Sequence, residues 1–366
     1  MRFMHAIAIV VSFWCTLADA SEPISDAQWE SDLDSLADGL LTRHPNFYTK
    51  MSVEEFESAF NDLFERIGTI DDQLMTIEVS RLVALGGDAH TTVGFGEIGA
   101  DMRQLPIRLM VMEDGVFVVH AVDTHTEHIG SRVVSINSVP INEVLDRVSV
   151  LFAYENESKR MGTSAWYATL LPALRAVDVI GEHHALELEI ELYTEDEVRT
   201  HTMGTIDGRS EARWVSFVHQ LEQPWAIAYR KQGGYYQSDF IPEHRAFYVA
   251  YNRCREAPDL PMAQFVEFVM SKCDELDAQR IIIDLRFNGG GDETVIWPLW
   301  QALEKSERFK YPGDIIGLIS RQTFSSAMSN SHQLRDNCRA ILIGEPTGGK
   351  PNHFGQLSRS SSPTRG

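Results

Sequence analysis

Cysteine is scarce in this chain of 366 residues, which contains four of them. Cys15 lies in the first twenty residues, and the others are Cys254, Cys273 and Cys338. The three cysteines outside the first twenty residues can form one disulfide at most, so a disulfide framework is excluded. No CxxC pair or Cys/His pair has the spacing of a structural zinc site. The sequence therefore predicts neither a metal nor a cofactor.

Basic residues are also in the minority. Lysine and arginine number 32 against 53 aspartates and glutamates, which gives a formal net charge of −21. Such a chain repels nucleic acid and anionic lipid headgroups, so neither is expected as a partner. After the first twenty residues no apolar run approaches the roughly 18 residues that span a bilayer. We therefore expect a soluble mature chain.

The first twenty residues have the pattern of a signal peptide. Met1-Arg2 gives a positive start, Ala6–Leu17 is a short apolar run, and Ala18-Asp19-Ala20 has the small-x-small pattern of a cleavage site. We expect export, with the mature protein in the periplasm or outside the cell.

Helical signals fill residues 25–86. Ser25 with Gln28 and Ser52 with Glu55 are capping-box patterns, each followed by apolar residues at helical spacing. A third apolar stripe ends at Gly86. We expect three helices, which form an N-terminal helical domain over residues 21–99.

The rest of the chain divides into a β-rich part and an α/β part. Residues 100–205 hold short segments of period two, among them Ile107–Met112 and Val116–Val119, which predict a hairpin. In residues 206–366 strands alternate with helices, and Ile281–Leu285, apolar except for Asp284, is a strand of the buried kind. This alternation predicts a sheet covered by helices on both faces.

Ser325 is the candidate nucleophile. It stands between an expected strand and an expected helix, where free N–H groups favour negative charge. Asn288–Gly291 follows a buried strand, and its glycines can leave N–H groups free for an oxyanion. The alternatives are a helix cap at Ser325 or Ser326 and a plain glycine turn.

Two further motifs supply candidate bases. Gly344–Lys350 resembles a phosphate-binding loop, but Pro351 stands where a magnesium-binding hydroxyl belongs, so nucleotide binding is not expected. Lys350 is instead a candidate base. His90 is another, because histidine accepts a proton near neutral pH. The GxSxG motif of α/β-hydrolases is absent.

Taken in order, Asp88–Thr91, Ile282–Gly291 and Thr323–Gly349 resemble motifs of the tail-specific, or C-terminal-processing, family of serine peptidases. The resemblance implies a crotonase-like α/β catalytic domain, a PDZ-like module over residues 100–205 and a helical cap before it. It also implies that Ser325 is the nucleophile and that the N–H groups of Ser326 and Gly290 form the oxyanion hole.

The family uses two kinds of base, and both have a match here. Lys350 corresponds to the lysine of processing peptidases, and His90 to the histidine of tricorn-like members. Ala89 stands where tricorn-like members of the family have a serine, and Gln356 stands where many relatives have a glutamate. The polar run that ends at Gly366 differs from a core strand, which suggests a truncated C-terminus. We prefer His90, because a lysine base must first lose its proton through burial.

The sequence thus predicts an exported serine endopeptidase that acts on polypeptides. The alternative is an inactive relative that binds extended peptides or a small apolar ligand. An acyl-CoA enzyme on a crotonase-like sheet is a weaker third hypothesis, because no basic cluster for the CoA phosphates is evident.

Overall fold

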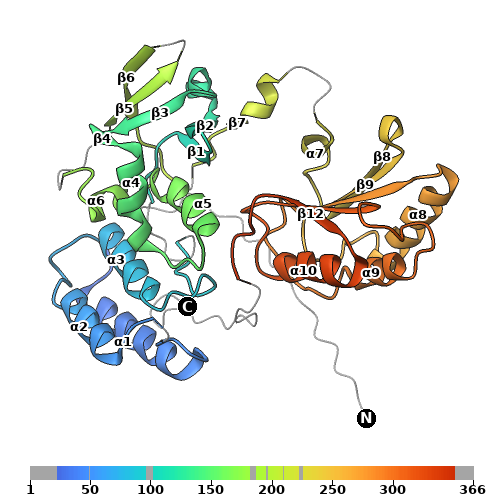
Figure 1. Ribbon diagram of the computed structural model, residues 1–366. Coiled ribbons are helices and arrows are strands. Elements are labelled where there is room, and N and C mark those ends of the chain that lie inside the picture. Colours follow the sequence, from blue (N-terminus) through green and yellow to red (C-terminus); the bar gives the residue numbers. More distant parts are fainter. Residues whose placement is uncertain are drawn as a thin grey trace.

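The structure is a computed structural model that describes residues 23–48, 50–95, 102–181, 187–194, 197–208, 210–221 and 226–350. The expected signal peptide and the polar run at the C-terminus lie outside the described residues. Two lobes lie side by side: an N-terminal lobe of residues 23–221 and a C-terminal lobe of residues 226–350 (Figure 1). Among the described helices, none is long and apolar enough to cross a membrane.

The three expected helices open the N-terminal lobe. They are α1 (Asp26–Arg43), α2 (Val53–Phe64) and α3 (Asp72–Ala84). At α2 the capping box is formed: Glu55 N–H donates to Ser52 Oγ at 3.1 Å, and Ser52 N–H donates to Glu55 Oε2 at 2.7 Å. Apolar residues from all three helices pack together, including Leu33, Phe56 and Met75. The loop after α3 carries Asp88 and His90.

The rest of the N-terminal lobe is built on a seven-stranded antiparallel sheet. Its strands follow the order β1-β2-β3-β5-β6, with β4 paired to β3 and β7 to β2. The strands are β1 (Ile107–Met112), β2 (Gly115–Val122), β3 (Arg132–Ile136), β4 (Val139–Pro140), β5 (Glu187–Thr194), β6 (Glu197–Gly204) and β7 (Trp214–Ser216). The expected hairpin of β1 and β2 is confirmed.

Three helices pack beside this sheet: α4 (Ile141–Val148), α5 (Glu157–Tyr167) and α6 (Leu171–Ala176). Short 3-10 turns lie at η1 (Asp123–His128), η2 (Ser149–Leu151) and η3 (Phe217–Gln220). The core of the sheet includes Ile77 of α3, and Ser80 Oγ of α3 donates to Leu151 O at 2.8 Å. The N-terminal lobe therefore has two apolar cores, one among α1, α2 and α3 and one at the sheet, and α3 contributes to both.

The C-terminal lobe holds a five-stranded sheet of order β12-β11-β10-β9-β8. Its strands are β8 (Tyr236–Ile241), β9 (Ala246–Tyr251), β10 (Arg280–Asp284), β11 (Ile315–Ile319) and β12 (Ile341–Gly344). Strands β9 to β12 are parallel, and β8 is antiparallel to β9. Its helices are α7 (Ile227–Arg230), α8 (Met262–Glu275), α9 (Trp297–Glu304) and α10 (Ser326–Cys338), with a turn η4 (Pro242–His244).

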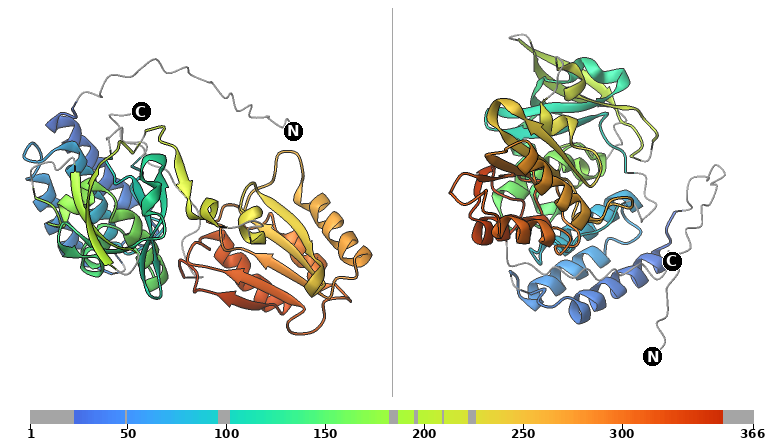
Figure 2. Two further views of the ribbon diagram at one scale, coloured as in Figure 1. Left: turned by 90° about the horizontal axis from the view of Figure 1, so that it is seen from above. Right: turned by 90° about the vertical axis from the view of Figure 1, so that its right-hand side faces the viewer.

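The expectation that helices cover both faces of this sheet is wrong for the described residues. Helices α8, α9 and α10 form one layer on the same face (Figures 1 and 2). The reason lies in the strand order: β9, β10, β11 and β12 are added in one direction, and right-handed crossovers then place every connecting helix on one side. On the opposite face, Ile341 and Ile343 of β12 are 45% and 51% exposed.

Cys254, Cys273 and Cys338 are all buried free thiols. Burial raises the pKa of Cys254 to about 11 and that of Cys273 to about 12. These thiols behave as small apolar core residues.

Candidate active site

Three loops of the C-terminal lobe meet beyond the carboxyl ends of β10, β11 and β12. Phe324 N–H donates to Asn288 O at 3.1 Å, which ties the loop after β11 to the loop after β10. Gly348 N–H donates to Thr323 O at 3.0 Å, which adds the loop after β12. Loops at this edge of a parallel sheet commonly carry the chemistry of α/β proteins.

Ser325 stands at the start of α10 in an unusual backbone conformation. Its φ is 52° and its ψ is −130°, a region that residues with a side chain rarely adopt. Its side chain makes no capping hydrogen bond to the helix. Buried Thr323 holds the preceding turn, because its hydroxyl donates to Leu285 O at 2.9 Å. The alternative of a simple cap therefore has no support from the geometry at Ser325.

The glycine turn passes directly against Ser325. A Cβ added at Gly290 would lie 2.6 Å from Ser325 Cβ and 3.1 Å from Ser326 N, and the φ of Gly290 is 107°. Residue 290 must be a glycine because a Cβ would clash with Ser325 and because its φ is positive. Ser326 Oγ donates to Gly291 O at 2.6 Å, which fixes the turn to α10.

The two N–H groups expected in an oxyanion hole differ in their surroundings. Ser326 is the first residue of α10, so its N–H has no acceptor within the helix. Gly290 N–H donates to Asn288 Oδ1 at 2.9 Å. Asn288 is fully buried, and its side-chain NH₂ donates to Tyr251 O at 2.9 Å. An oxyanion would thus compete with Asn288 for the Gly290 donor.

His90 reaches this edge from the N-terminal lobe. Its ring stacks on Phe324 with the centroids 4.4 Å apart and the planes at 17°. Phe324 directly precedes Ser325, so the structure brings His90 beside the segment that carries the candidate nucleophile. The side chain of His90 is 7% exposed.

Asp88 fixes the loop that carries His90. Its carboxylate accepts hydrogen bonds from His90 N–H at 3.1 Å and from Thr91 Oγ1 at 2.7 Å, and it pairs with His44 Nε2 at 3.2 Å. Burial raises the pKa of Asp88, but the hydrogen bonds outweigh burial and hold the pKa well below its ordinary value. Asp88 is therefore a stably ionised group 3.8 Å from His90 Nδ1.

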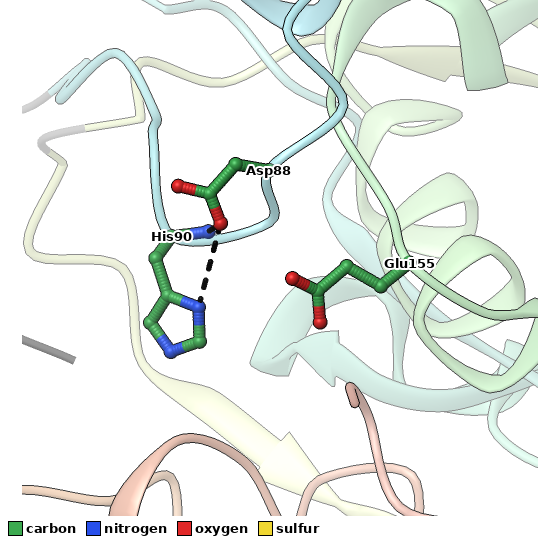
Figure 3. A group of neighbouring side chains, drawn as sticks. All are labelled: Asp88, His90 and Glu155. Atoms are coloured by element: carbon green, nitrogen blue, oxygen red, sulfur yellow. Dashed lines mark hydrogen bonds and ion pairs between the residues drawn. The ribbon is translucent and has the colours of Figure 1, made fainter. Parts of the chain in front are cut away.

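The segment before and within the first turn of α5 supplies three residues that the sequence analysis missed. The carboxylate of Glu155 faces the ring of His90 (Figure 3). Asn156 donates to Thr347 O at 2.9 Å and to Gly349 O at 3.1 Å. The ammonium group of Lys159 lies 4.0 Å from the ring centroid of Phe324. Burial lowers the pKa of Lys159, and the nearby charge of Glu155 opposes this shift.

One signal for this segment was present in the sequence. Asn156 caps α5, since its Oδ1 accepts from Lys159 N–H at 2.9 Å, and asparagine before a helix is a recognisable start. That signal predicts a helix but does not say what the helix faces. The contact with residues 347–350, almost two hundred positions later, could not be predicted from local pattern.

Lys350 lies close to the same group, but through its backbone. Its N–H donates to Glu155 Oε2 at 2.9 Å, and the residue is exposed. A lysine base needs burial that disfavours its charged form. The surroundings of Lys350 do not provide that burial, whereas His90 is buried against Phe324.

Asp88, His90 and Glu155 also have the spacing of a three-ligand cation site, since one polar atom from each lies within 4.8 Å of the others. Carboxylates and imidazole are suitable ligands for several divalent metals. The oxygens of Asp88 already accept hydrogen bonds from His90, Thr91 and His44, as described above. The sequence predicted no cation site here.

No protein-family model matches the chain, and no curated protein matches it in sequence. The expected mixed α/β fold, with a sheet in each lobe, is confirmed, and solved structures share it. Mature CPAF bound to lactacystin is similar over 90% of this chain and 86% of that chain, with 12% identity and a TM-score of 0.59.

A second structure of mature CPAF covers 88% of this chain and 84% of that chain at 12% identity, with a TM-score of 0.56. The photosystem II D1 C-terminal processing protease covers 87% and 82% at 13% identity, with a TM-score of 0.37. The chain therefore has the fold of mature CPAF.

Proposed function

We propose that this protein is a serine endopeptidase of the tail-specific type and that Ser325 is its nucleophile. One observation carries the proposal: Ser325 is held at φ 52° against Gly290, with its hydroxyl not used as a helix cap. Strain of this kind persists only where surrounding structure imposes it, and it is concentrated at functional sites.

In the proposed reaction Ser325 Oγ attacks the carbonyl carbon of a peptide bond while His90 takes the hydroxyl proton. The oxygen of the tetrahedral intermediate is stabilised by Ser326 N–H and by a donor of the glycine turn, either Gly290 freed from Asn288 or a neighbour. Collapse of the intermediate breaks the C–N bond, and His90 returns the proton to the leaving amine. Water then hydrolyses the acyl-enzyme by the reverse sequence. Lys350 remains the alternative base.

The same proposal assigns the parts of the chain. Residues 1–20 are a signal peptide and residues 21–99 a helical cap. The expected PDZ-like module extends past its expected end at residue 205 to residue 221, because β7 (Trp214–Ser216) pairs with β2. The crotonase-like catalytic domain then begins after residue 221 instead of at residue 206. The substrate is an extended segment of an exported protein or peptide, met in the periplasm or outside the cell.

A second candidate function follows from the hydrogen bond between Gly290 N–H and Asn288. With that donor occupied, the site could bind an extended peptide or a small apolar ligand without acylation. This candidate predicts peptide binding with no covalent labelling of Ser325.

The experiment compares Ser325→Ala with wild-type protein in cleavage of unstructured peptides and in labelling by a fluorophosphonate probe. Lactacystin, which mature CPAF binds, is a second probe. Ser329→Ala is the matched control, because Ser329 lies one turn later in α10 and is partly exposed. We expect Ser325→Ala alone to lose cleavage and labelling. Equal turnover in Ser325→Ala and wild type would overturn the assignment.

A further inference from the structure

Asp88, His90 and Glu155 bring an imidazole and two carboxylates to one place. One ligand atom from each lies within 4.8 Å of the other two. The residues come from two segments, the loop after α3 and the segment before α5 (Figure 3). Atoms that share a Zn²⁺ ion lie about 3–3.5 Å apart, because each bond is about 2 Å long and the geometry is tetrahedral. A contraction of about 1 Å would therefore bring the three groups to ligand distances.

The loop after α3 supplies two of these groups as a pair that is largely shielded from water. Asp88 Oδ1 lies 3.8 Å from His90 Nδ1, and the two side chains are 11% and 7% exposed. Asp88 Oδ1 also accepts one hydrogen bond, from His90 N–H at 3.1 Å. The other partners of Asp88 bind Oδ2. A carboxylate oxygen has two lone pairs, so Oδ1 retains the capacity to bind a cation.

Glu155 supplies the third group from a fixed position. Its Oε2 accepts from Lys350 N–H at 2.9 Å, which leaves Oε1 for a cation. Two carboxylates as close as those of Asp88 and Glu155 repel each other, and a divalent cation between them would offset that repulsion. A donor set of one imidazole and two carboxylates suits a divalent transition metal, whereas Mg²⁺ and Ca²⁺ prefer oxygen ligands alone.

We propose that Asp88, His90 and Glu155 form a binding site for a divalent transition-metal ion such as Zn²⁺. An ion bound there occupies a ring nitrogen of His90, and it holds the imidazole in a coordination bond. The metal then inhibits cleavage, because the ring is no longer available to take the proton of Ser325. This second consequence rests on the proposed peptidase function, whereas metal binding itself does not.

The test is calorimetric titration of Zn²⁺ into the full chain carrying Ser325→Ala, which does not depend on activity. We expect saturable binding that Glu155→Gln, added to the same chain, weakens by more than about 10-fold, since even a group behind a metal ligand contributes that much. Glu157→Gln is the matched control, because Glu157 is an exposed carboxylate nearby that pairs with Arg160. That variant should bind Zn²⁺ as the parent does.

Lys159 provides a variant whose effect has the opposite sign. Burial lowers the pKa of Lys159, and the negative charge of Glu155 opposes this shift, so the ammonium group and the carboxylate attract each other. A metal ion has to compete with that attraction. Lys159→Met should therefore tighten Zn²⁺ binding by about 3–10-fold. Weaker binding in this variant would contradict an ion held by Glu155.

A group of histidines elsewhere in the N-terminal lobe is the competing place for Zn²⁺. The ring centroids of His128 and His201 are 4.7 Å apart, and those of His125 and His128 are 6.2 Å apart. His128→Gln separates the two locations, and we expect it to leave the affinity unchanged. The proposal is overturned if His128→Gln weakens Zn²⁺ binding while Glu155→Gln does not.

Cleavage assays of the chain with Ser325 intact test the inhibition. Zn²⁺ should slow peptide cleavage, and Glu155→Gln should need a higher Zn²⁺ concentration for the same relative loss. Zn²⁺ binding at this site with no loss of cleavage contradicts the inhibition. Undiminished cleavage by Ser325→Ala overturns the proposed function instead, and the calorimetric affinities still decide the metal site. If Glu155→Gln does not fold, as judged by thermal unfolding, His90→Gln takes its place in the titration.

Discussion

At the scale of single residues, the site depends on a close approach of two backbones. Gly290 and Ser325 both have positive φ values, 107° and 52°, although only the first is a glycine. Because Gly290 has no Cβ, Ser325 can lie directly against it, and of the two residues only Ser325 has a strained backbone conformation. The sequence predicted a glycine turn with free N–H groups at residues 288–291, but the residue against which this turn packs could be found only from the structure.

Gly290→Ala should therefore destabilise the protein and disable the site. The added Cβ would meet Ser325 Cβ at 2.6 Å and Phe324 O at 3.0 Å, at a φ that alanine disfavours. We expect a loss of about 1–3 kcal/mol in the free energy of unfolding and loss of Ser325 labelling. Gly289→Ala is the matched control, because a Cβ there meets nothing within 4 Å. Urea unfolding and probe labelling measure both effects, and equal behaviour of the two variants would contradict this account.

Asp88 gives a prediction about pH. Its pKa is lower in the folded protein than in the unfolded chain, so its ionised form stabilises the fold at pH values above the unfolded pKa of about 4. That contribution is lost as pH falls from about 4 toward the folded pKa. Asp88→Asn should thus be less stable than wild type at pH 7, and the difference should shrink at pH 3. Chemical denaturation at both values tests this, and a difference that does not change with pH would refute it.

At the scale of elements, the sequence pattern predicted those helices and strands whose conformation is determined by residues close in the sequence. Capping residues and apolar stripes located α1, α2 and α3, and period-two segments located β1 and β2. Strand β8 and helices α5 and α6 were missed. In β8 the residues are partly exposed and carry little apolar alternation, since the strand lies at a sheet edge. Tertiary pairing with β9 decides its conformation.

Part of the candidate site was likewise predictable from the sequence, and part of it was not. Ser325, Gly290 and Ser326 are neighbours because parallel strands bring their loops to one edge, and strand alternation in the sequence implies that much. Glu155 and Lys159 come from the N-terminal lobe, and no periodicity relates them to Phe324. Their role depends on how the lobes dock, which is set by contacts spread over the whole chain.

At the scale of the whole molecule, the lobes are joined next to the site through Arg321. Its guanidinium donates to Val111 O of β1 at 2.8 Å and pairs with Glu345, while its stem packs against Gly162 of α5. The side chain is 14% exposed, so these bonds are largely shielded from water. Arg321 thus ties the turn before Ser325 to both the sheet and α5 of the N-terminal lobe.

Arg321→Met should weaken this junction while keeping much of the apolar stem. We expect a loss of about 1–3 kcal/mol in unfolding free energy, because the Val111 carbonyl and Glu345 each lose a charged donor. We also expect kcat/KM of the folded variant to fall, since docking of the two lobes holds His90 against Phe324.

Arg308→Met provides the comparison, because Arg308 pairs with Asp274 and Asp277 within the C-terminal lobe alone. That variant should lose stability but keep kcat/KM. Denaturation curves and peptide cleavage of the two variants distinguish a junction that assembles the site from one that only adds stability. If both variants lose stability equally and neither loses activity, the N-terminal lobe does not supply the base, and Lys350 of the C-terminal lobe becomes the group to test.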